Sequence, residues 1–505
     1  MLRAMSATSA SAAPAGSSRA APLLAAAFAI AALAPAIALR GFTVDDALIT
    51  ARYAAHVAAG EGYRLSAGGP VTDGVTPLGF VYLLAPFARQ GPLAALAAAK
   101  VLGVTAWTLA AGVLGLAVAR VAAPGSRALA LVPLALVAGS APLGAWAASG
   151  METGLVTALG ALAAALPILG RPRAAAVCAG LAAGLRPELL PWATTLGIGL
   201  FLSHRAEPGR EEAEPAPGGS ADASAPRVRR AWLLLLAVLP FLAVAAVRLA
   251  VFGRPAPLSI FAKAPDGRLG LMYAAACALL AGPPALLAPI AIARLRGFPR
   301  ALVASVFVHL GAVALAGGDW MPLSRLVVPV LPSLALGALF LAKEAALPAT
   351  AARLALAVAG QTFVLVHVGP VAARVGEDRL QVLGELRPAL APARVVASLD
   401  IGWVGAATDA TIVDLAGVTD PAIAALPGGH TSKQIPAGLL DARRADTLVL
   451  LLAPGERAAE PWTRSRFARA VEAWVATTPG IGEEFTPVAE SSPPHLRYLV
   501  LRRAR

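Results

Sequence analysis

Long apolar stretches recur along the first 370 residues of this chain, and they restrict its fold more than any other feature. A helix needs about 20 consecutive apolar residues to cross the hydrocarbon core of a bilayer. In lipid the backbone must satisfy its own hydrogen bonds, which favours helices over open strands. Only 14% of the residues are charged, whereas soluble domains carry about 25%. The sequence therefore predicts a polytopic α-helical membrane protein.

The apolar stretches predict about eleven transmembrane helices, because each approaches the length needed to cross a bilayer. Two of them, on either side of Pro187 and Pro191, are short and fit either one broken helix or two half-buried ones. The predicted spans are 20–39, 93–119, 127–147, 152–170, 174–186, 189–203, 231–252, 269–293, 301–317, 326–342 and 350–369.

Basic residues lie mostly in every second turn between these spans. The positive-inside rule puts such turns in the cytoplasm, so we expect a cytoplasmic N-terminus and a flexible cytoplasmic linker at 205–230. The first external loop is then 40–92. The formal charge of +13 follows from this topology, and we expect no nucleic-acid partner.

The pattern changes after residue 370. Short strand-like segments at 394–399, 411–415, 447–452 and 495–501 alternate with helical ones at 401–407 and 462–476. This alternation is typical of an α/β domain. We therefore divide the chain into a transmembrane domain, 1–370, and a C-terminal extracytoplasmic α/β domain, 371–505.

The loop 40–92 is rich in polar side chains. Residues 45–59 have the pattern of a helix in which Asp45, Arg52 and His56 share one face, while Asp46 and Tyr53 share another. A carboxylate beside Arg and His at the membrane surface fits a general base next to a phosphate clamp. The same residues also fit a purely structural role, in which the two aspartates cap the helix and Arg52 forms a surface ion pair.

The other turns predicted on this side also carry polar residues. Each alone fits a helix cap, a snorkelling side chain or a loop cation. Ionisable groups at membrane depth are costly, however, and their gathering on one side indicates a shared site, as for an enzyme acting on a lipid phosphate. No nucleotide-binding motif accompanies them. The candidates are Asp73 and Thr76 in the second half of the loop 40–92, and in the other turns Glu152, Arg186, Glu188, Lys263, Asp319, Trp320 and Arg325.

Taken in order from residue 45 to residue 420, these motifs resemble one family. It is the terminal β-(1→2)-arabinofuranosyltransferase-like family of the GT-C class, known from mycobacterial cell-wall synthesis. The matching strings are Asp45-Asp46-Ala47-Leu48-Ile49, Arg52-Tyr53-Ala54, Gly60-Glu61-Gly62, Asp73-Gly74-Val75-Thr76-Pro77-Leu78, Ser149-Gly150-Met151-Glu152, Gly184-Leu185-Arg186-Pro187-Glu188, Phe261-Ala262-Lys263, Gly318-Asp319-Trp320-Met321-Pro322 with Arg325 and Val328-Pro329-Val330-Leu331-Pro332, and Asp400-Ile401-Gly402 with Asp414-Leu415-Ala416-Gly417-Val418-Thr419-Asp420.

The resemblance implies an inverting glycosyltransferase in the bacterial inner membrane. It would move arabinofuranose or another sugar from a polyprenyl-phosphate donor to a periplasmic glycan or glycolipid in cell-envelope synthesis. It implies Asp45 or Asp46 as the catalytic base, and we prefer Asp45 because its face also carries Arg52 and His56. Departures at Val75 and Phe80 leave the sugar and the acceptor open.

The resemblance also makes Arg52, Lys263, Arg325 and Arg186 candidates for the donor phosphate. Asp45 and Asp46 could ligate a divalent cation through oxygen, but adjacent carboxylates do not specify a metal.

Two other classes fit a multi-span chain with large outer loops. Secondary transporters tend to have internal repeats and ionisable residues near the bilayer centre, whereas the charges here lie at the predicted outer rim. A lipid-linked oligosaccharide ligase or polymerase would share the architecture and the membrane-lipid substrate. Uptake of a solute by vesicles would identify the first, and product analysis the second.

Overall fold

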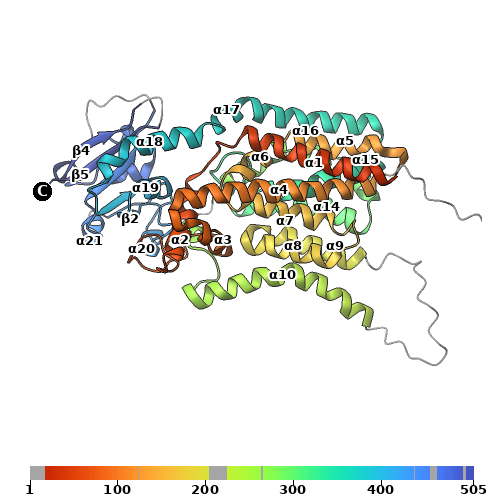
Figure 1. Ribbon diagram of the computed structural model, residues 1–505, viewed down its shortest axis with the longest axis horizontal. Helices are drawn as coiled ribbons and strands as arrows, with labels where there is room; N and C mark the ends of the chain where they lie inside the picture. The colour runs from red at the N-terminus through yellow and green to blue at the C-terminus, as the bar shows by residue number, and fades with distance from the viewer. Residues whose placement is uncertain are drawn as a thin grey trace, which may run out of the picture.

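The computed structural model describes residues 17–122, 124–203, 225–262, 266–436, 438–454, 463–492 and 496–504. Helices make up 68% of the structure. Figure 1 shows a helical bundle with a small sheet domain at one end, which we call the sheet end of the bundle. The predicted linker lies largely outside the described residues, and so does Lys263.

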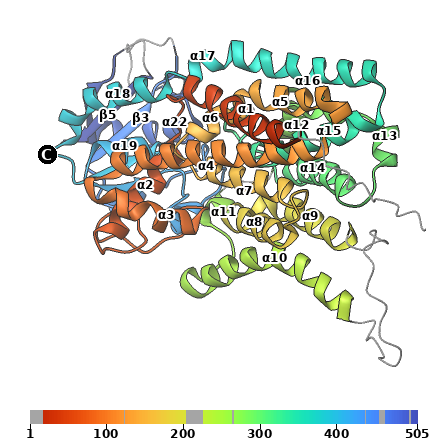
Figure 2. The ribbon, with the colours of Figure 1, turned by 45° about the vertical axis from the view of Figure 1, so that its right-hand side comes forward.

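The helices of the bundle correspond to the apolar stretches of the sequence, since each predicted span contains at least one helix. Figures 1 and 2 show α10 on the outer side of the bundle, next to α8 and α9. The α-helices are α1 (Ser17–Ala38), α2 (Asp45–Ala58), α3 (Leu78–Leu84), α4 (Pro92–Val121), α5 (Leu131–Ala138), α6 (Ala141–Ala148), α7 (Thr153–Ala165), α8 (Pro172–Leu185), α9 (Leu190–Ser203), α10 (Ala225–Phe252), α11 (Leu258–Ala262), α12 (Gly267–Leu280), α13 (Pro289–Arg294), α14 (Gly297–Leu315), α15 (Leu331–Glu344) and α16 (Leu347–His367). Short 3₁₀ helices are η1 (Ala85–Gln90), η2 (Pro124–Ala130), η3 (Pro187–Leu189), η4 (Pro283–Leu286) and η5 (Val328–Val330).

Among the residues that the structure describes, five helices are long and apolar enough to cross a membrane, namely α1, α4, α10, α14 and α16. A sixth span results if the pair Ser126–Ala138 and Ala141–Ala148, bent by 51°, counts as one. Helices α7, α8 and α12 are apolar but shorter. The helical, membrane-type architecture is therefore confirmed in outline, while eleven crossings remain a prediction.

Two predicted spans are broken rather than continuous. Between α12 and α13, Gly282 adopts a φ of +104° and is followed by Pro283 and Pro284. Proline lacks the backbone donor that would continue the helix, so the chain turns there. Between α5 and α6, the Ser140 side chain accepts a hydrogen bond from the Leu143 amide at 3.3 Å and caps a new helix.

Basic turns meet at the end of the bundle that lies away from the sheet. Lys343 donates to the carbonyl of Val121 at 3.3 Å, and Arg294 donates to the carbonyl of Glu344 at 3.3 Å. In Figure 2, α13, which ends at Arg294, lies far from the sheet domain. The polar motifs in α2 and its neighbouring loops lie at the sheet end (Figure 1).

The C-terminal region folds as a five-stranded sheet with order β2-β1-β3-β5-β4. Strand β1 pairs in parallel with β2 and β3, whereas β5 pairs antiparallel with β3 and β4. The predicted small α/β domain is thus confirmed. Its elements are α17 (Gly369–Ala372), α18 (Val375–Leu390), β1 (Val395–Ser398), α19 (Ile401–Ala407), β2 (Thr411–Asp414), α20 (Pro421–Ala424), α21 (Leu439–Ala442), β3 (Thr447–Leu451), η6 (Arg464–Arg466), α22 (Ala470–Ala476), α23 (Ile481–Glu484), β4 (Phe485–Glu490) and β5 (Tyr498–Arg503).

The hydrophobic core of the bundle continues into the sheet domain. Ile401, Trp403 and Val404 of α19 belong to the same buried cluster as Leu48 and Ile49 of α2. The other face of the sheet has its own core. The sheet domain therefore contacts the bundle through a buried apolar surface centred on α19 and α2.

Candidate functional site

Helix α2 connects the bundle to the sheet domain, and its first turn carries the two predicted aspartates. The helix begins directly after the extended residue Val44, and no side chain caps it. Carboxylates are stabilised at this position by the helix dipole. Asp45 and Asp46 are adjacent in sequence, so their side chains leave the helix in different directions and meet different partners.

Asp46 lies beside an arginine from a distant loop. The Arg325 guanidinium is 3.3 Å from the Asp46 carboxylate and 2.9 Å from the carboxylate of Asp319. The Asp46 side chain is 40% exposed, whereas those of Arg325 and Asp319 are 11% and 1% exposed. Asp46 is therefore the solvent-facing member of a largely buried ionic group.

A second arginine extends this group. Arg186 contacts Glu152 at 3.3 Å and Glu188 at 2.6 Å, and it donates to the Thr153 hydroxyl at 3.0 Å. Arg325 also interacts electrostatically with both glutamates. We call Asp46, Glu152, Arg186, Glu188, Asp319 and Arg325 the Arg325 cluster. It joins four segments that are far apart in sequence.

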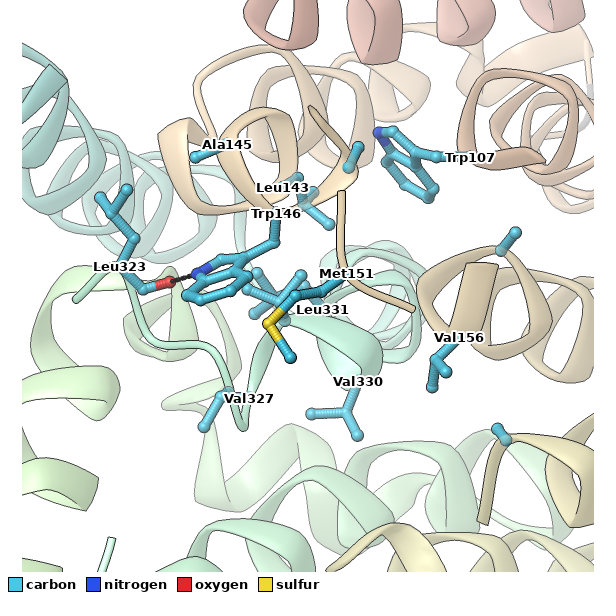
Figure 3. Packing of buried hydrophobic residues seen from close by; sticks show 14 of the residues in the cluster. Trp107, Leu143, Ala145, Trp146, Met151, Val156, Leu323, Val327, Val330 and Leu331 are labelled. Atoms are coloured by element: carbon cyan, nitrogen blue, oxygen red, sulfur yellow. Dashed lines mark hydrogen bonds between the residues drawn. The ribbon is translucent and has the colours of Figure 1, made fainter. Parts of the chain in front are cut away.

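Arg325 follows a strained stretch of backbone. Leu323 and Ser324 have φ values of +59° and +56°, in the left-handed region that residues other than glycine rarely adopt. The indole N–H of Trp146 donates to the Leu323 carbonyl at 2.9 Å, as Figure 3 shows. His309 and Tyr273 bind the backbone of the next loop residue, Leu326. Such strain persists only where surrounding contacts impose it, and it is frequent at functional sites.

The Arg325 cluster packs against closely packed apolar side chains. Figure 3 shows the Trp146 ring beside the Leu323 carbonyl, with Met151 and Leu331 next to the ring. The Arg325 guanidinium also contacts the sulfur atoms of Met151 and Met321. This packing fixes the direction in which Arg325 points.

Asp45 faces the sheet domain instead of the cluster. Its carboxylate accepts hydrogen bonds from the amides of Gly402 at 3.0 Å and Trp403 at 2.7 Å, at the start of α19. Burial, and then the charge of Asp400, raise the pKa of Asp45 to about 8. Asp45 therefore holds two domains together, and this contact occupies both of its oxygens.

Arg52 shares this face, as predicted, but its partners are carbonyl oxygens. It donates to Leu65 at 2.7 Å and Ala410 at 2.9 Å, and also to Gly405 and Thr408. Three of these four residues belong to the sheet domain. These contacts use the hydrogen bonds that a phosphate would need, so Arg52 binds backbone in this structure.

The remaining loop candidates contact residues both near to and far from them in the sequence. The Tyr53 hydroxyl is 2.8 Å from that of Thr72, and His56 is 2.7 Å from Glu61. Thr76 lies 3.3 Å from Ser259. None of these contacts reaches the Arg325 cluster.

Asp73 pairs with Arg248, a buried residue that the sequence analysis missed. Burial raises the pKa of Asp73, and Arg248 acts in the opposite direction. Arg248 also donates to the carbonyls of Val75 and Thr76. It thereby ties the second half of the loop 40–92 to the end of α10. An arginine near the end of an apolar helix was the available signal, because such residues require a partner.

Trp320 lies between the cluster and the sheet domain. Its side chain is 54% exposed, and its ring centroid is 6.1 Å from that of His430. It directly follows Asp319, whose carboxylate accepts from the Trp320 amide at 2.9 Å.

A second ionic group, which we call the Arg469 cluster, lies inside the sheet domain. Arg469 contacts Asp400 at 2.8 Å and Glu472 at 2.6 Å. Arg379 is 3.8 Å from Asp400, and the Tyr498 hydroxyl donates to the same carboxylate. Burial opposes ionisation of Asp400, but Arg469, Arg379 and the Tyr498 hydroxyl together outweigh it and lower the pKa of Asp400.

In both ionic groups the carboxylates lie against arginines. Within the described residues, no group of three or more His, Cys, Asp or Glu side chains is arranged to hold a metal ion. Asp45 and Asp46, considered above for a divalent cation, turn to separate partners.

Comparison with known proteins adds one finding. Residues 372–490 match a family described as a domain of unknown function, DUF8728. The match begins at the last residue of α17 and ends at the last residue of β4, so it covers most of the sheet domain and none of the Arg325 cluster. No curated protein and no solved structure matches the chain.

Proposed function

We propose that this protein is an inverting membrane glycosyltransferase that takes a sugar from a polyprenyl-phosphate donor, with Asp46 as the general base. One observation carries the proposal. Asp46 and Arg325, from two of the strings that resemble the GT-C family, lie 3.3 Å apart at the sheet end of the bundle, and Asp46 is 40% exposed. An exposed carboxylate beside a fixed cation can receive a proton from an acceptor hydroxyl.

The chemistry follows from these groups. Asp46 takes the proton of the acceptor hydroxyl, whose oxygen attacks the anomeric carbon of the donor sugar. The bond from that carbon to the phosphate oxygen breaks, and polyprenyl phosphate leaves with both electrons. Arg325 orients Asp46 and presents N–H groups to the developing charge on the phosphate. Fixed donors of this kind lower the barrier because they need no reorganisation during the reaction.

The proposal modifies one prediction from the sequence. Asp45 was preferred as the base because Arg52 and His56 share its face. In the structure its oxygens accept two amide hydrogen bonds, which favours Asp46 for the reaction. Trp320, exposed beside Asp319, offers an apolar surface to the acceptor. Lys263 remains a candidate phosphate ligand. The inner-membrane location and the periplasmic position of the sheet domain belong to the same proposal.

The direct test is transfer by the purified protein in detergent. Synthetic polyprenyl-phosphate arabinofuranose, mannose and glucose would each be supplied with a glycan acceptor, and the products would be analysed for linkage and anomeric configuration. We expect one donor to give an inverted product and free polyprenyl phosphate. Product whose anomeric configuration is retained, or no transfer from any of these donors, would contradict the proposal.

Asp46→Asn supplies the matched variant. General acid–base catalysis contributes about 10²- to 10⁴-fold, so we expect a loss of kcat of that size without a change in melting temperature. Asp441→Asn is the control, because Asp441 is an exposed carboxylate of the sheet domain that pairs with Arg503. It should retain wild-type turnover.

A further inference from the structure

Helices α2 and α19 approach each other more closely than ordinary side chains would permit. A Cβ atom on Gly402 would lie 2.1 Å from the backbone oxygen of Asp45, and one on Gly405 would lie 2.9 Å from a guanidinium nitrogen of the Arg52 side chain. The two glycines are three residues apart and so lie on the same face of α19. The sheet domain therefore presents to α2 a helix face that lacks side chains at the two points of contact.

Polar contacts fix both ends of this approach. At the start of α2, the Asp45 carboxylate accepts the amides of Gly402 and Trp403. Two turns later, Arg52 donates to the carbonyls of Gly405, Thr408 and Ala410. Asp45 thus binds amides in the first turn of α19. Arg52 binds carbonyls in the last turn of α19 and in the residues that follow it. Together they restrict both rotation and translation of α2 against the sheet domain.

The Asp45 contact lies just beyond the carboxyl end of strand β1, at the start of α19. Residue 400 directly precedes α19 and follows β1, a strand with parallel neighbours on both sides. Open α/β sheets commonly take ligands outside the carboxyl ends of such strands. Here a carboxylate of the bundle occupies that place, which indicates that this edge of the sheet serves to hold α2.

Asp46, the proposed base, is the residue after Asp45. Its position relative to Arg325 depends on the rotation of the first turn of α2. That turn has no side-chain cap of its own. The amides of α19 are therefore the polar contacts that hold the Asp45 carboxylate, and through it the direction of Asp46.

We propose that the sheet domain is a positioning element for α2, and that Asp45, Arg52, Gly402 and Gly405 are positioning residues that aim Asp46 at Arg325. This inference rests on the proposed transfer reaction for its activity measurements, whereas its structural measurements are independent of that reaction. Misplacement of a reacting group by about 1 Å can cost about 10²-fold in rate, so a domain without reacting groups of its own can still control turnover.

The test uses the full-length protein in detergent and the variant Gly402→Ala, in which the added methyl group meets the backbone of Asp45. Hydrogen exchange would be measured by mass spectrometry on peptides from α2, from α19 and from the sheet, together with kcat and KM for the donor. We expect faster exchange in α2 and α19, unchanged exchange in β3 and β5, a fall in kcat of at least about 10-fold, and a donor KM within about threefold of wild type.

Gly384→Ala is the matched control, because Gly384 lies in α18 of the same domain and a Cβ there has nothing within 4 Å. It should exchange and turn over as the wild type does. If Gly402→Ala does not fold, Asp45→Ala provides the same test from the other side of the contact, since it removes both acceptors without adding atoms. Faster exchange throughout the sheet would indicate a general stabilising role and would contradict positioning.

Asp46→Asn separates the two proposals. It should lower kcat by about 10²- to 10⁴-fold while α2 and α19 exchange at wild-type rates. If the wild type transfers no sugar, the proposed function fails, and the exchange of Gly402→Ala still decides whether α19 holds α2. If exchange in α2 is unchanged in both Gly402→Ala and Asp45→Ala, or if it rises while kcat stays at the wild-type value, the positioning role is wrong.

Discussion

The Arg325 cluster and the Arg469 cluster contain the same chemical groups but differ in how they meet solvent. In the Arg469 cluster the carboxylates of Asp400 and Glu472 are 8% and 0% exposed. In the Arg325 cluster the Asp46 side chain is 40% exposed, although its neighbours are buried. A buried, mutually paired cluster holds elements together, whereas a cluster with one open carboxylate can also receive a substrate.

This difference also appears in the backbone. Arg325 follows two residues other than glycine with positive φ, whereas Arg469 begins α22 from an ordinary extended conformation, with φ −129° and ψ 149°. Strain of this kind costs of the order of 1–3 kcal/mol per residue. A fold retains such strain where the position of a side chain matters more than the local free energy. This strain is a second difference between the Arg325 cluster and the Arg469 cluster.

The largest effect on stability is expected from Arg469→Met. Removing one partner of a buried ion pair leaves an uncompensated charge and costs about 3–5 kcal/mol. Here Glu472 would lose its guanidinium partner, and Asp400 would keep only the more distant Arg379 at 3.8 Å. The measurement is the melting temperature in detergent. Arg443→Met is the control, because the Arg443 side chain is 37% exposed and pairs with Asp420 near the surface, so it should cost at most about 1 kcal/mol. Equal losses for the two variants would contradict the assignment of the Arg469 cluster as a scaffold.

A smaller effect, on rate instead of stability, is expected from Arg325→Lys. Lysine keeps the charge but lacks the fork that bonds two carboxylates at once. Asp46 would then lose its fixed orientation beside Asp319. Loss of one preorganised donor typically costs about 10²- to 10³-fold in kcat, and we expect about 10²-fold. If turnover per folded molecule is unchanged while the melting temperature falls as far as in Arg469→Met, both clusters are scaffolds.

The sequence predicts the helical and α/β divisions well because both depend on local patterns. The predicted strands at 394–399, 411–415 and 447–452 correspond to β1, β2 and β3. Strand β4 was missed because four of its six residues are exposed and it contains Pro487, so it has little apolar alternation. Continuous helix was predicted through Gly282 because the surrounding residues are apolar, although the two prolines after it end the helix.

The candidate site was predicted less completely, for a different reason. Helical spacing correctly places Asp45 and Arg52 on one face, but it contains no information on what that face meets. The partners of Arg52 are backbone carbonyls, and any sequence has these. The nearest usable signal was the spacing of Gly402 and Gly405, which permits close approach of another chain segment.

The last prediction concerns the pH dependence of the Asp45 contact. The pKa of Asp45 rises from 3.8 to about 8 in the folded protein through burial and the neighbouring charge of Asp400. The folded state then binds the proton more tightly than the unfolded state does. Its stabilisation is complete below about pH 4 and is lost as the pH rises through 8. We expect the melting temperature to fall as the pH rises from 5 to about 8 and to level off above it.

Asp45→Asn isolates this contribution because asparagine has nearly the same shape and does not titrate. The difference in melting temperature between wild type and variant should change steadily with pH up to about 8 and then level off. Burial raises the pKa of Asp414 to about 6. For Asp414→Asn, the difference in melting temperature from the wild type should therefore level off at a lower pH than it does for Asp45→Asn. A difference between wild type and Asp45→Asn that stays constant from pH 5 to pH 9 would mean that Asp45 is ionised where it meets α19. In that case the two amides of α19 stabilise a charged Asp45 carboxylate. The difference between Asp45, which is bound by α19, and Asp46, which is exposed, would then depend on geometry alone.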